Sequence, residues 1–468
     1  MPAADLSEWE LPKLRASFTF QDDCKALSGE DQQAQEFFDV KFYPYNPEGA
    51  PPIFAAISKK HVVVCRLSQT NDANPCEIIQ VIRDDDEEAS NCACCWSKDP
   101  ETDRPLICVT GSGGRIDVYD VVEGKVANTL VGHGGGINDL ATSPANPYII
   151  ASASDDTTAW HDTGRYVLSA GHDQVINMWA IPELPTEHAE VPIILHYPHF
   201  SSSEVHSGLV DCVAFFGDLI LSRACHEDSI VLWRIEGFSS QDPVLSPSEA
   251  PTTYDTKKET RSAYTPTLTP DRPAHFTRLL QFHTPDCGVQ FFLRFRMFNV
   301  PGKHPILAFA NAKSKTFFWD LERFITYSRY IEDLKEAQQI KIAPPIKPSW
   351  LSVKRGKKHD AAANLRAPIA DKDSMVSASP DPDTLFTGIG QHTKITLDNW
   401  AETYDISNPQ GLIKPHKSAG IEGAFVGRQV GWSPEGEWCV VVGNNNRALI
   451  YQRWAKDYKV STPGNSAV

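Results

Sequence analysis

The stretch that decides the fold runs from Leu130 to Asp156 and reads LVGHGGGINDLATSPANPYIIASASDD. A histidine framed by glycines, His133, stands ahead of a β-rich run that ends in SASDD. Two interpretations are open. A histidine and an aspartate are brought together for proton transfer, or the polar residues close one blade of a propeller. The second interpretation is favoured if the pattern recurs.

The pattern recurs along the chain. A strand-like run is followed by a tight polar turn and a second β run that ends in an aromatic residue, as in YVLSAGHDQVINMWAI and LILSRACHEDSIVLWRI. Cys65 takes the final place in the first copy, and later copies end at Tyr119, Trp179, Trp233, Trp319 and Tyr451. Such copies, at a period of roughly 40–45 residues, are typical of WD blades. We therefore predict an all-β fold, a seven-bladed WD-repeat β-propeller.

Polar residues of such blades hydrogen-bond to one another inside the sheet. They satisfy buried groups that would otherwise cost about 1–3 kcal/mol each. His133, Ser152 and Asp156 suit these places, so we interpret them as a structural blade tetrad rather than a catalytic set.

One interval is too short for a complete blade. Asp156 and Asp173 hold equivalent turn positions but lie much closer together than a period of roughly 40–45 residues. Roughly 25–30 residues are missing around residues 156–160, including the third and fourth strands of one blade and the start of its successor. An incomplete blade would expose sheet edges. An omitted exon, an engineered deletion and a genuinely shortened blade remain open.

Composition shifts suggest the limits of the domain. We expect an N-terminal extension at residues 1–35, the propeller at 36–456 and a C-terminal tail at 457–468. Residues 239–272, rich in Pro, Ser and Thr, are expected to form a disordered loop insert. Residues 326–392 form a second insert, with a short surface helix in FITYSRYIEDLKEAQQI and a disordered part.

The overall composition is that of an ordinary globular protein, with 41% hydrophobic and 22% charged residues. The formal net charge of −16 argues against non-specific binding to nucleic acid and favours a cationic partner such as a histone tail. The alternative is that acidity only keeps the protein soluble. The eleven cysteines lie mostly in strand-like runs, which indicates buried, reduced thiols. No window is apolar enough for a membrane helix.

Motifs that would carry other chemistry are weak. NCACCW, at residues 91–96, has no second pair at zinc spacing, so we predict no metal. GSGGRI lacks the spacing of a dinucleotide fingerprint, and no nucleophile and base converge, so we predict neither cofactor nor enzymatic activity. KRGKK, at residues 354–358, is a nuclear-import patch, a nucleic-acid contact or a solvated loop.

Three segments carry a more specific resemblance: VGHGGGINDLATSPANPYIIASASDD, HYPHFSSSEVHSGLVDCVAFFGDLILSRACHEDSIVLWRI and HPILAFANAKSKTFFWDLE. They resemble the extra sex combs / embryonic ectoderm development (EED) family, from about Phe37 to Lys456, and the long inserts resemble fungal members. The resemblance implies a non-catalytic, nuclear core subunit of a Polycomb repressive complex. Implied partners are an Enhancer-of-zeste-type methyltransferase, which contributes a docked helix, a Suppressor-of-zeste-12-type subunit and the methylated histone H3 tail. Neither membrane binding nor direct sequence-specific DNA binding is expected.

The resemblance also implies a trimethyl-lysine reader that stimulates the methyltransferase and promotes heritable silencing. Trimethylammonium has no N–H donor, so aromatic faces must select it, each contributing about 0.5–2 kcal/mol. By position, the methyl-lysine cage comprises Phe38, Phe291, Phe292 and Cys92. Cys92 departs from the family, which has tyrosine there, and a thiol offers no ring face. For each phenylalanine, packing between blades is the alternative.

The same resemblance places three peptide-binding residues near the mouth: Asn138, Asp211 and Arg428. Hydrogen bonding within a blade is the alternative for each. At the level of the whole protein, the alternative is a generic WD-repeat adaptor, such as a ubiquitin-ligase substrate receptor, that does not read methyl-lysine.

Overall fold

The structure is a computed structural model that describes residues 8–20, 35–68, 74–154, 156–184, 192–252, 259–265, 274–351 and 392–454. The chain divides into two compact units, each described by itself below. One comprises Met1–Trp9 with Glu322–Ser407, and the other comprises Glu10–Leu321 with Asn408–Val468.

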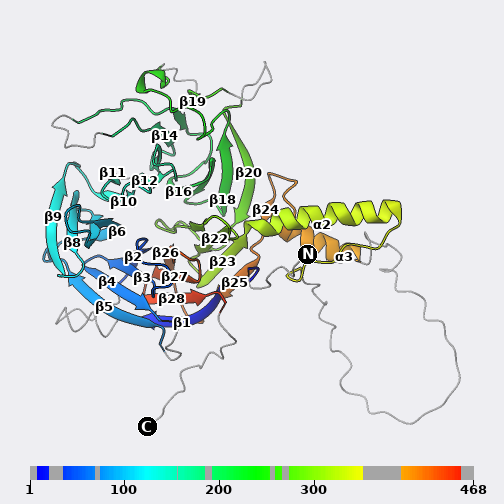
Figure 1. Ribbon diagram of the computed structural model, residues 1–468, viewed down its shortest axis with the longest axis horizontal. Helices are drawn as coiled ribbons and strands as arrows, with labels where there is room; N and C mark the ends of the chain where they lie inside the picture. The colour runs from blue at the N-terminus through cyan, green and yellow to red at the C-terminus, as the bar shows by residue number, and fades with distance from the viewer. Residues whose placement is uncertain are drawn as a thin grey trace, which may run out of the picture. The chain divides into compact units, whose positions relative to one another are not determined.

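The larger unit is a ring of mainly antiparallel sheets (Figure 1). Seven innermost strands, β2 (Phe37–Phe42), β6 (Asn91–Lys98), β10 (Ile137–Thr142), β12 (Asp156–Trp160), β16 (Val210–Phe216), β21 (Arg296–Phe298) and β26 (Gly427–Trp432), follow one another around the axis. Each contacts the next, and β26 contacts β2, so the ring is closed. The predicted all-β propeller is confirmed.

Six sheets extend outward to four or five strands. Continuing from the innermost strand, they add β3 (Ile53–Ser58), β4 (His61–Leu67) and β5 (Cys76–Arg83); β7 (Pro105–Gly111), β8 (Arg115–Asp120) and β9 (Lys125–Val131); β13 (Tyr166–Gly171), β14 (Ile176–Ala180), β15 (Phe200–Ser202) and β19 (Thr260–Ser262); β17 (Leu219–Ala224), β18 (Ser229–Ile235), β20 (Phe276–His283) and β24 (Leu412–Ile413); β22 (Ile306–Ala310), β23 (Lys315–Asp320) and β25 (Lys417–Gly420); β27 (Trp438–Gly443), β28 (Arg447–Gln452) and β1 (Lys13–Thr19).

The seventh sheet has two strands, β10 and β11 (Ile150–Ser154). Its third and fourth strands are absent from the described residues, and β12, the innermost strand of the next sheet, follows β11 directly. The prediction of an incomplete blade around residues 156–160 matches this junction. The start of the successor, however, is present as β12, so the deficit is smaller than predicted. The ring thus has six extended sheets and one half-sheet.

The half-sheet leaves the neighbouring outermost strand, β9, exposed to solvent. Every residue of β9, the outermost strand of the preceding sheet, is exposed, including Val131 at 81%. In β5, the corresponding strand one sheet earlier, five of eight residues are buried or half-buried. The missing third and fourth strands would have covered β9, because neighbouring blades of a propeller pack face to face.

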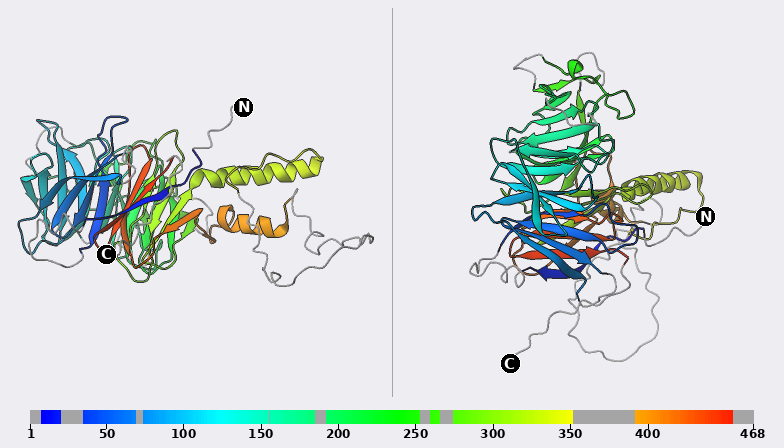
Figure 2. Two further views of the ribbon diagram at one scale, coloured as in Figure 1. Left: turned by 90° about the horizontal axis from the view of Figure 1, so that it is seen from below. Right: turned by 60° about the vertical axis from the view of Figure 1, so that its left-hand side comes forward.

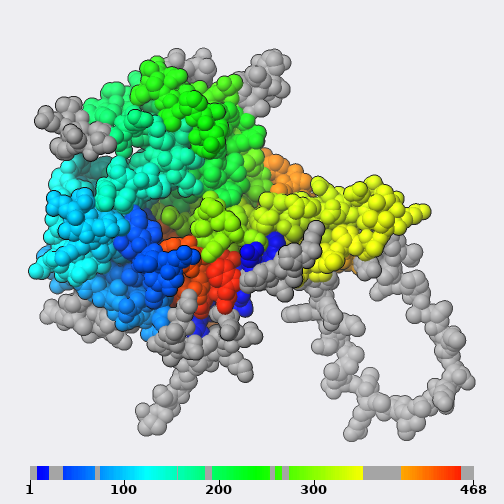
Figure 3. All heavy atoms as spheres, in the orientation of Figure 1, coloured from blue at the N-terminus to red at the C-terminus, as the bar shows by residue number. Residues whose placement is uncertain are grey.

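The ring is closed by its N-terminal strand, a finding that corrects one predicted boundary. β1 pairs with β28, so that a blue strand lies beside the red C-terminal strands (Figure 2). Residues 1–35 were expected to lie outside the propeller, yet Phe20 is fully buried in the core shared by β2 and β27. Atoms from the two ends of the coloured chain also meet in the space-filling view (Figure 3).

The inserts also differ from expectation. The expected disordered loop 239–272 contains a 3-10 turn, η1 (Pro247–Glu249), and strand β19, which pairs with β15. The strand adds to the open edge of β15, and the hydroxyl groups of Ser202 and Thr260 share a hydrogen bond of 2.7 Å between the two strands. The parts of this loop at 253–258 and 266–272, the predicted disorder at 352–391 and the C-terminal tail lie outside the described residues.

The smaller unit contains two helices, α2 (Leu321–Ile340) and α3 (Lys394–Tyr404). The predicted short helix is therefore present and is longer than expected. Its buried residues recur at helical spacing, at Tyr327, Tyr330 and Leu334, and pack with Trp400 and Tyr404 of α3. None of the described helices is long and apolar enough to cross a membrane.

Candidate functional site at the channel mouth

Five innermost strands share a local irregularity near their first residue. In β2, Phe37 pairs with Ser58 and Asp39 with Ile57, so the residue between them has no partner across the ladder. The same one-residue slip occurs in β6, β10, β16 and β26. A β-bulge of this kind re-aims the side chain of the extra residue. The five bulge residues are Phe38, Cys92, Asn138, Asp211 and Arg428, all of which were predicted as site residues.

The bulges explain why residues far apart in sequence belong to one site. Equivalent positions of strands that run in the same sense around a ring lie at the same level of its channel. β12 and β21 pair without such a slip. Before β21, however, the chain turns back at Phe292, whose positive φ of 56° is uncommon for a residue with a side chain.

Three predicted cage rings form a continuous row. The centroids of Phe38 and Phe292 are 6.0 Å apart with an interplanar angle of 71°, and those of Phe291 and Phe292 are 6.2 Å apart at 63°. All three residues are half-buried rather than sealed in a core. The structure therefore brings Phe38 and Phe291 into one cluster, with Phe292 between them.

Cys92 is the member of the predicted cage without a ring. Its Sγ lies 3.6 Å from the carbonyl oxygen of Ile137, to which the thiol donates. Burial raises the pKa of the Cys92 thiol to about 11, so the side chain is neutral at physiological pH. It can contribute apolar contact but no quadrupole.

A fourth ring, which the sequence analysis missed, extends the row. The imidazole of His172 is centred 5.0 Å from the Phe291 ring at an angle of 70°. His172 lies in the turn between β13 and β14, seven positions before the blade-ending Trp179. The repeat pattern places His172 in a turn between two strands of a blade. The sequence does not show that this turn, rather than another, reaches Phe291.

Arg294 was also missed, and it connects the bulges. This guanidinium is 5% exposed. Its Nε donates to the carbonyl oxygen of Asp211 at 3.2 Å, and its Nη2 donates to that of Asn138 at 3.1 Å. Its backbone N–H donates to the carbonyl oxygen of Arg428, and its guanidinium carbon lies 5.2 Å from the Phe292 centroid. Arg294 thus contacts three bulge residues, two through its guanidinium and one through its backbone, and one cage ring.

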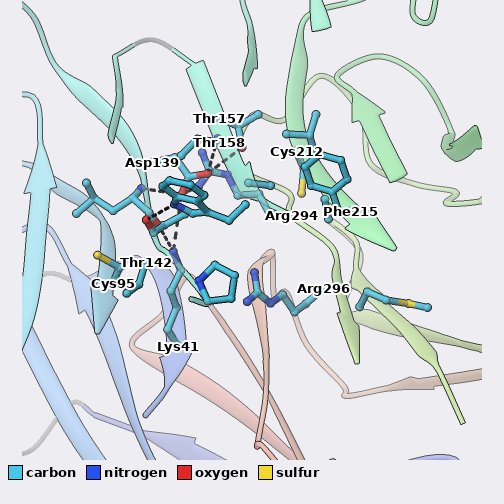
Figure 4. Close-up of a pocket in the computed structure, with 18 of the residues that line it drawn as sticks. Lys41, Cys95, Asp139, Thr142, Thr157, Thr158, Cys212, Phe215, Arg294 and Arg296 are labelled. Carbon is cyan, nitrogen blue, oxygen red and sulfur yellow. Dashed lines mark hydrogen bonds and ion pairs between the residues drawn. The ribbon is translucent and has the colours of Figure 1, made fainter. Parts of the chain in front are cut away.

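Asp139 balances this cation. The carboxylate lies 3.4 Å from Arg294 Nη1 and 3.8 Å from Lys41 Nζ, and it accepts hydrogen bonds from Thr157 Oγ1 and the Thr158 amide. Burial alone would raise the pKa of Asp139, but Arg294 and Lys41 hold it below its usual value. Figure 4 shows these groups converging from β2, β10, β12 and the segment before β21. They line a cavity of about 600 Å³ within the channel.

The three predicted peptide-binding residues are placed differently. Asn138 is half-buried, and its side-chain amide makes no hydrogen bond to the described residues, so it is available to a ligand. Asp211 is 4% exposed, and both its carboxylate oxygens accept from Arg223 Nη1 at 3.0 Å. Arg428 donates to Glu36 at 2.6 Å and to the carbonyl oxygen of Phe291 at 2.5 Å. Internal pairing therefore favours a positioning role for Asp211 and Arg428.

The predicted blade tetrad is only partly assembled. His133 Nε2 and Ser152 Oγ are 2.8 Å apart, as expected. Asp156 instead belongs to the next sheet, where it is the first residue of β12 and pairs with Gly171. Its usual place is the turn between the second and third strands of one blade, and the half-sheet has no third strand.

A complete set occurs in the β16–β18 sheet. Trp233 Nε1 donates to Ser222 Oγ at 2.9 Å, Ser222 is 2.7 Å from His206 Nε2, and His206 Nδ1 is 2.6 Å from Glu227. A glutamate takes the position expected for aspartate. Within the described ranges, no cluster of His, Cys, Asp and Glu is suited to hold a metal ion.

Comparison with protein families agrees with the repeat. The WD domain, G-beta repeat model matches residues 124–159 and 157–180. The two matches overlap at residues 157–159, within β12.

Two curated relatives indicate the closer family. The chain is 58% identical over 569 residues to "Polycomb protein EED" of Chaetomium thermophilum, covering 99% of this chain and 100% of the relative. It is 23% identical to "Polycomb protein esc" of Drosophila melanogaster, covering 66% of this chain and 75% of the relative. The first alignment is longer than the 468 residues of this chain, so it crosses positions where this chain has none.

Solved structures give the same result. A chain in "Crystal structure of the Chaetomium Thermophilum polycomb repressive complex 2 (PRC2)" superposes with a TM-score of 0.85 at 60% identity, covering 97% of this chain and 100% of that one. A chain in "Structure of ctPRC2 in complex with H3K27me3 and H3K27M" has a TM-score of 0.85 at 61% identity and the same coverage.

Proposed function

The chain belongs to the family of the Polycomb proteins EED and esc, and we propose that it is a non-catalytic core subunit of a Polycomb-type histone H3 lysine methyltransferase complex. It acts in the nucleus, where it binds trimethyl-lysine on the H3 tail and stimulates the methyltransferase, promoting heritable gene silencing. The similarity to a chain from a structure named for H3K27me3 supports this assignment.

The row of rings is the observation that carries the proposal. A trimethylammonium group keeps its charge but has no N–H donor, so it gains from ring faces rather than from hydrogen-bond acceptors. Phe38, Phe291 and Phe292 meet edge to face at one mouth of the channel, and each remains partly exposed.

The surrounding groups hold this arrangement in place. Arg428 donates to the backbone of Phe291, and Arg294 lies over one face of Phe292. Asn138 offers a free side-chain amide for the backbone of an extended peptide. Cys92 occupies the fourth position with a neutral thiol, so the selectivity for trimethyl-lysine comes from the phenylalanines.

Protein partners complete the proposal. We assign a helix of an Enhancer-of-zeste-type methyltransferase as a docked partner and a Suppressor-of-zeste-12-type subunit as a further member of the complex. The family relationship supports both assignments. Co-purification of the full chain with an Enhancer-of-zeste N-terminal helix tests the first, and its failure would count against membership of such a complex.

Calorimetric titration tests the reading of the histone mark. The full chain should bind a trimethylated H3 peptide more tightly than the unmethylated peptide. Phe292→Leu, which retains apolar bulk but lacks a ring face, should weaken trimethyl binding by about 2- to 30-fold. Phe215→Leu is the control, because Phe215 lines the cavity and not the ring row. Equal binding of both peptides would favour the generic WD-repeat adaptor.

A further inference from the structure

The row of rings ends on an imidazole. His172 meets Phe291 edge to face at 5.0 Å, Phe291 meets Phe292 at 6.2 Å, and Phe292 meets Phe38 at 6.0 Å. These are ordinary separations for aromatic pairs. The row therefore has four members, and one of them can change its charge.

The position of His172 is set by its turn rather than by core packing. The side chain is exposed, and the Gln174 amide donates to the Gly171 carbonyl across the turn at 3.2 Å. Asp173 Oδ1 accepts from the Val175 amide at 3.0 Å. An exposed turn residue in contact with a cage ring has no structural need to be aromatic.

The charged groups around the row come from several elements. Arg428 on β26 pairs with Glu36 before β2, and Arg294 before β21 pairs with Asp139 on β10. Asp211 on β16 pairs with Arg223, and Asp173 shares the turn of His172. Guanidinium groups keep their charge between pH 6 and pH 8, whereas imidazole groups ordinarily titrate within that range. Burial raises the pKa of the Asp211 carboxyl, which is paired with Arg223.

We propose that His172 is the fourth wall of the cage and makes trimethyl-lysine binding depend on pH. This inference rests on the proposed function. The neutral imidazole adds a ring face and apolar contact beside Phe291. The imidazolium places a second positive charge beside the trimethylammonium group and repels it. Methyl-lysine binding is therefore strongest above neutrality and weakens as the pH falls towards 6.

A matched control exists in the next sheet. His226 also lies seven positions before a blade-ending tryptophan, Trp233, and its side chain is also exposed. It makes no ring contact within the described part of the chain. His226 has a positive φ of 70°, whereas in the His172 turn the positive φ falls on Gln174. His226→Ala therefore removes an exposed turn histidine that does not reach the cage.

The test is calorimetric titration of the full chain with a trimethyl-lysine H3 peptide that lacks histidine. His172→Ala should weaken binding at pH 8 by about 2- to 30-fold, whereas His226→Ala should not. Between pH 8 and pH 6 the dissociation constant of the unmodified chain should rise by at least about 3-fold. His172→Phe should bind at both pH values and lose this dependence.

The outcomes separate the inference from the proposed function. If binding stays selective for the trimethylated peptide but changes neither with pH nor in His172→Ala, the role of His172 is overturned. The proposed reading of methyl-lysine would then still stand. A pH dependence that persists in His172→Phe would also overturn it. Absence of any preference for the trimethylated peptide at pH 8 would overturn the proposed function itself.

Discussion

At the scale of the residue, a few buried charges position the rings that would contact a ligand. Arg294 joins the backbone carbonyls of Asn138 and Asp211, lies over Phe292 and pairs with Asp139. The half-buried cage rings therefore depend on a buried cation that contacts Phe292. Loss of that cation should affect folding as well as binding.

Arg294→Met should lower the free energy of unfolding by about 3–5 kcal/mol, because removing one partner leaves the buried Asp139 carboxylate poorly compensated. Arg296→Met is the control, since Arg296 is exposed and should change stability by less than about 0.5 kcal/mol. Urea denaturation of both variants measures the difference. Equal stability of the two variants would contradict the claim that the buried Arg294 guanidinium stabilises the fold through Asp139.

Glu227 gives a second prediction at this scale. Burial alone would raise the pKa of its carboxyl, but hydrogen bonds from His206 and Ser207 lower it to about 2. A depressed folded pKa stabilises the native state above the unfolded value of about 4.5 and loses this contribution as the pH falls towards 2. Stability should therefore fall more steeply over this range than in Glu227→Gln, as followed by denaturation at each pH. Parallel curves would contradict this prediction.

At the scale of the element, repeated strands were predictable and their irregularities were not. Trp179 and Trp233 end homologous runs, and the chain does form strands there. The one-residue slips at Phe38 and Asn138 depend on ladder register between strands, which composition does not reveal. The contact of His172 with Phe291 likewise depends on which turn reaches across the mouth.

The half-sheet gives a prediction about association. β11 pairs only with β10 among the strands described, and β9 exposes Val126, Leu130 and Val131. Open edges and apolar patches favour association between chains. Val131→Lys should reduce concentration-dependent light scattering with little change in unfolding free energy. Val122→Lys, at an exposed turn residue outside β9, is the control. An equal reduction of light scattering by both variants would show that β9 does not mediate association.

At the scale of the whole molecule, the ring is closed by a sheet that contains both the first strand of the chain, β1, and the last, β28. Residues 1–35 were expected to form an extension because their composition differs from that of the propeller, and a single strand there carries no copy of the repeat. Pairing of β1 with β28 can be recognised only when the last sheet is seen to lack an outermost strand. Six recurring runs predicted the ring, but the pairing of its closing strand could be seen only in the structure.

Phe20 offers a test of this closure. Its ring lies 4.5 Å from that of Phe37, and its side chain is fully buried. Phe20→Ala should destabilise the chain by about 3–5 kcal/mol. It should also speed hydrogen exchange in β28 more than in β17. Phe18→Ala, at a half-buried position of β1, should have a smaller effect.

The most direct test compares two peptides that differ only in charge. One carries trimethyl-lysine, and the other carries its uncharged isostere, in which carbon replaces the quaternary nitrogen. If ring faces at the channel mouth recognise a cation, the charged peptide should bind about 2- to 30-fold more tightly. Equal affinity for both peptides would show that the rings provide only an apolar pocket.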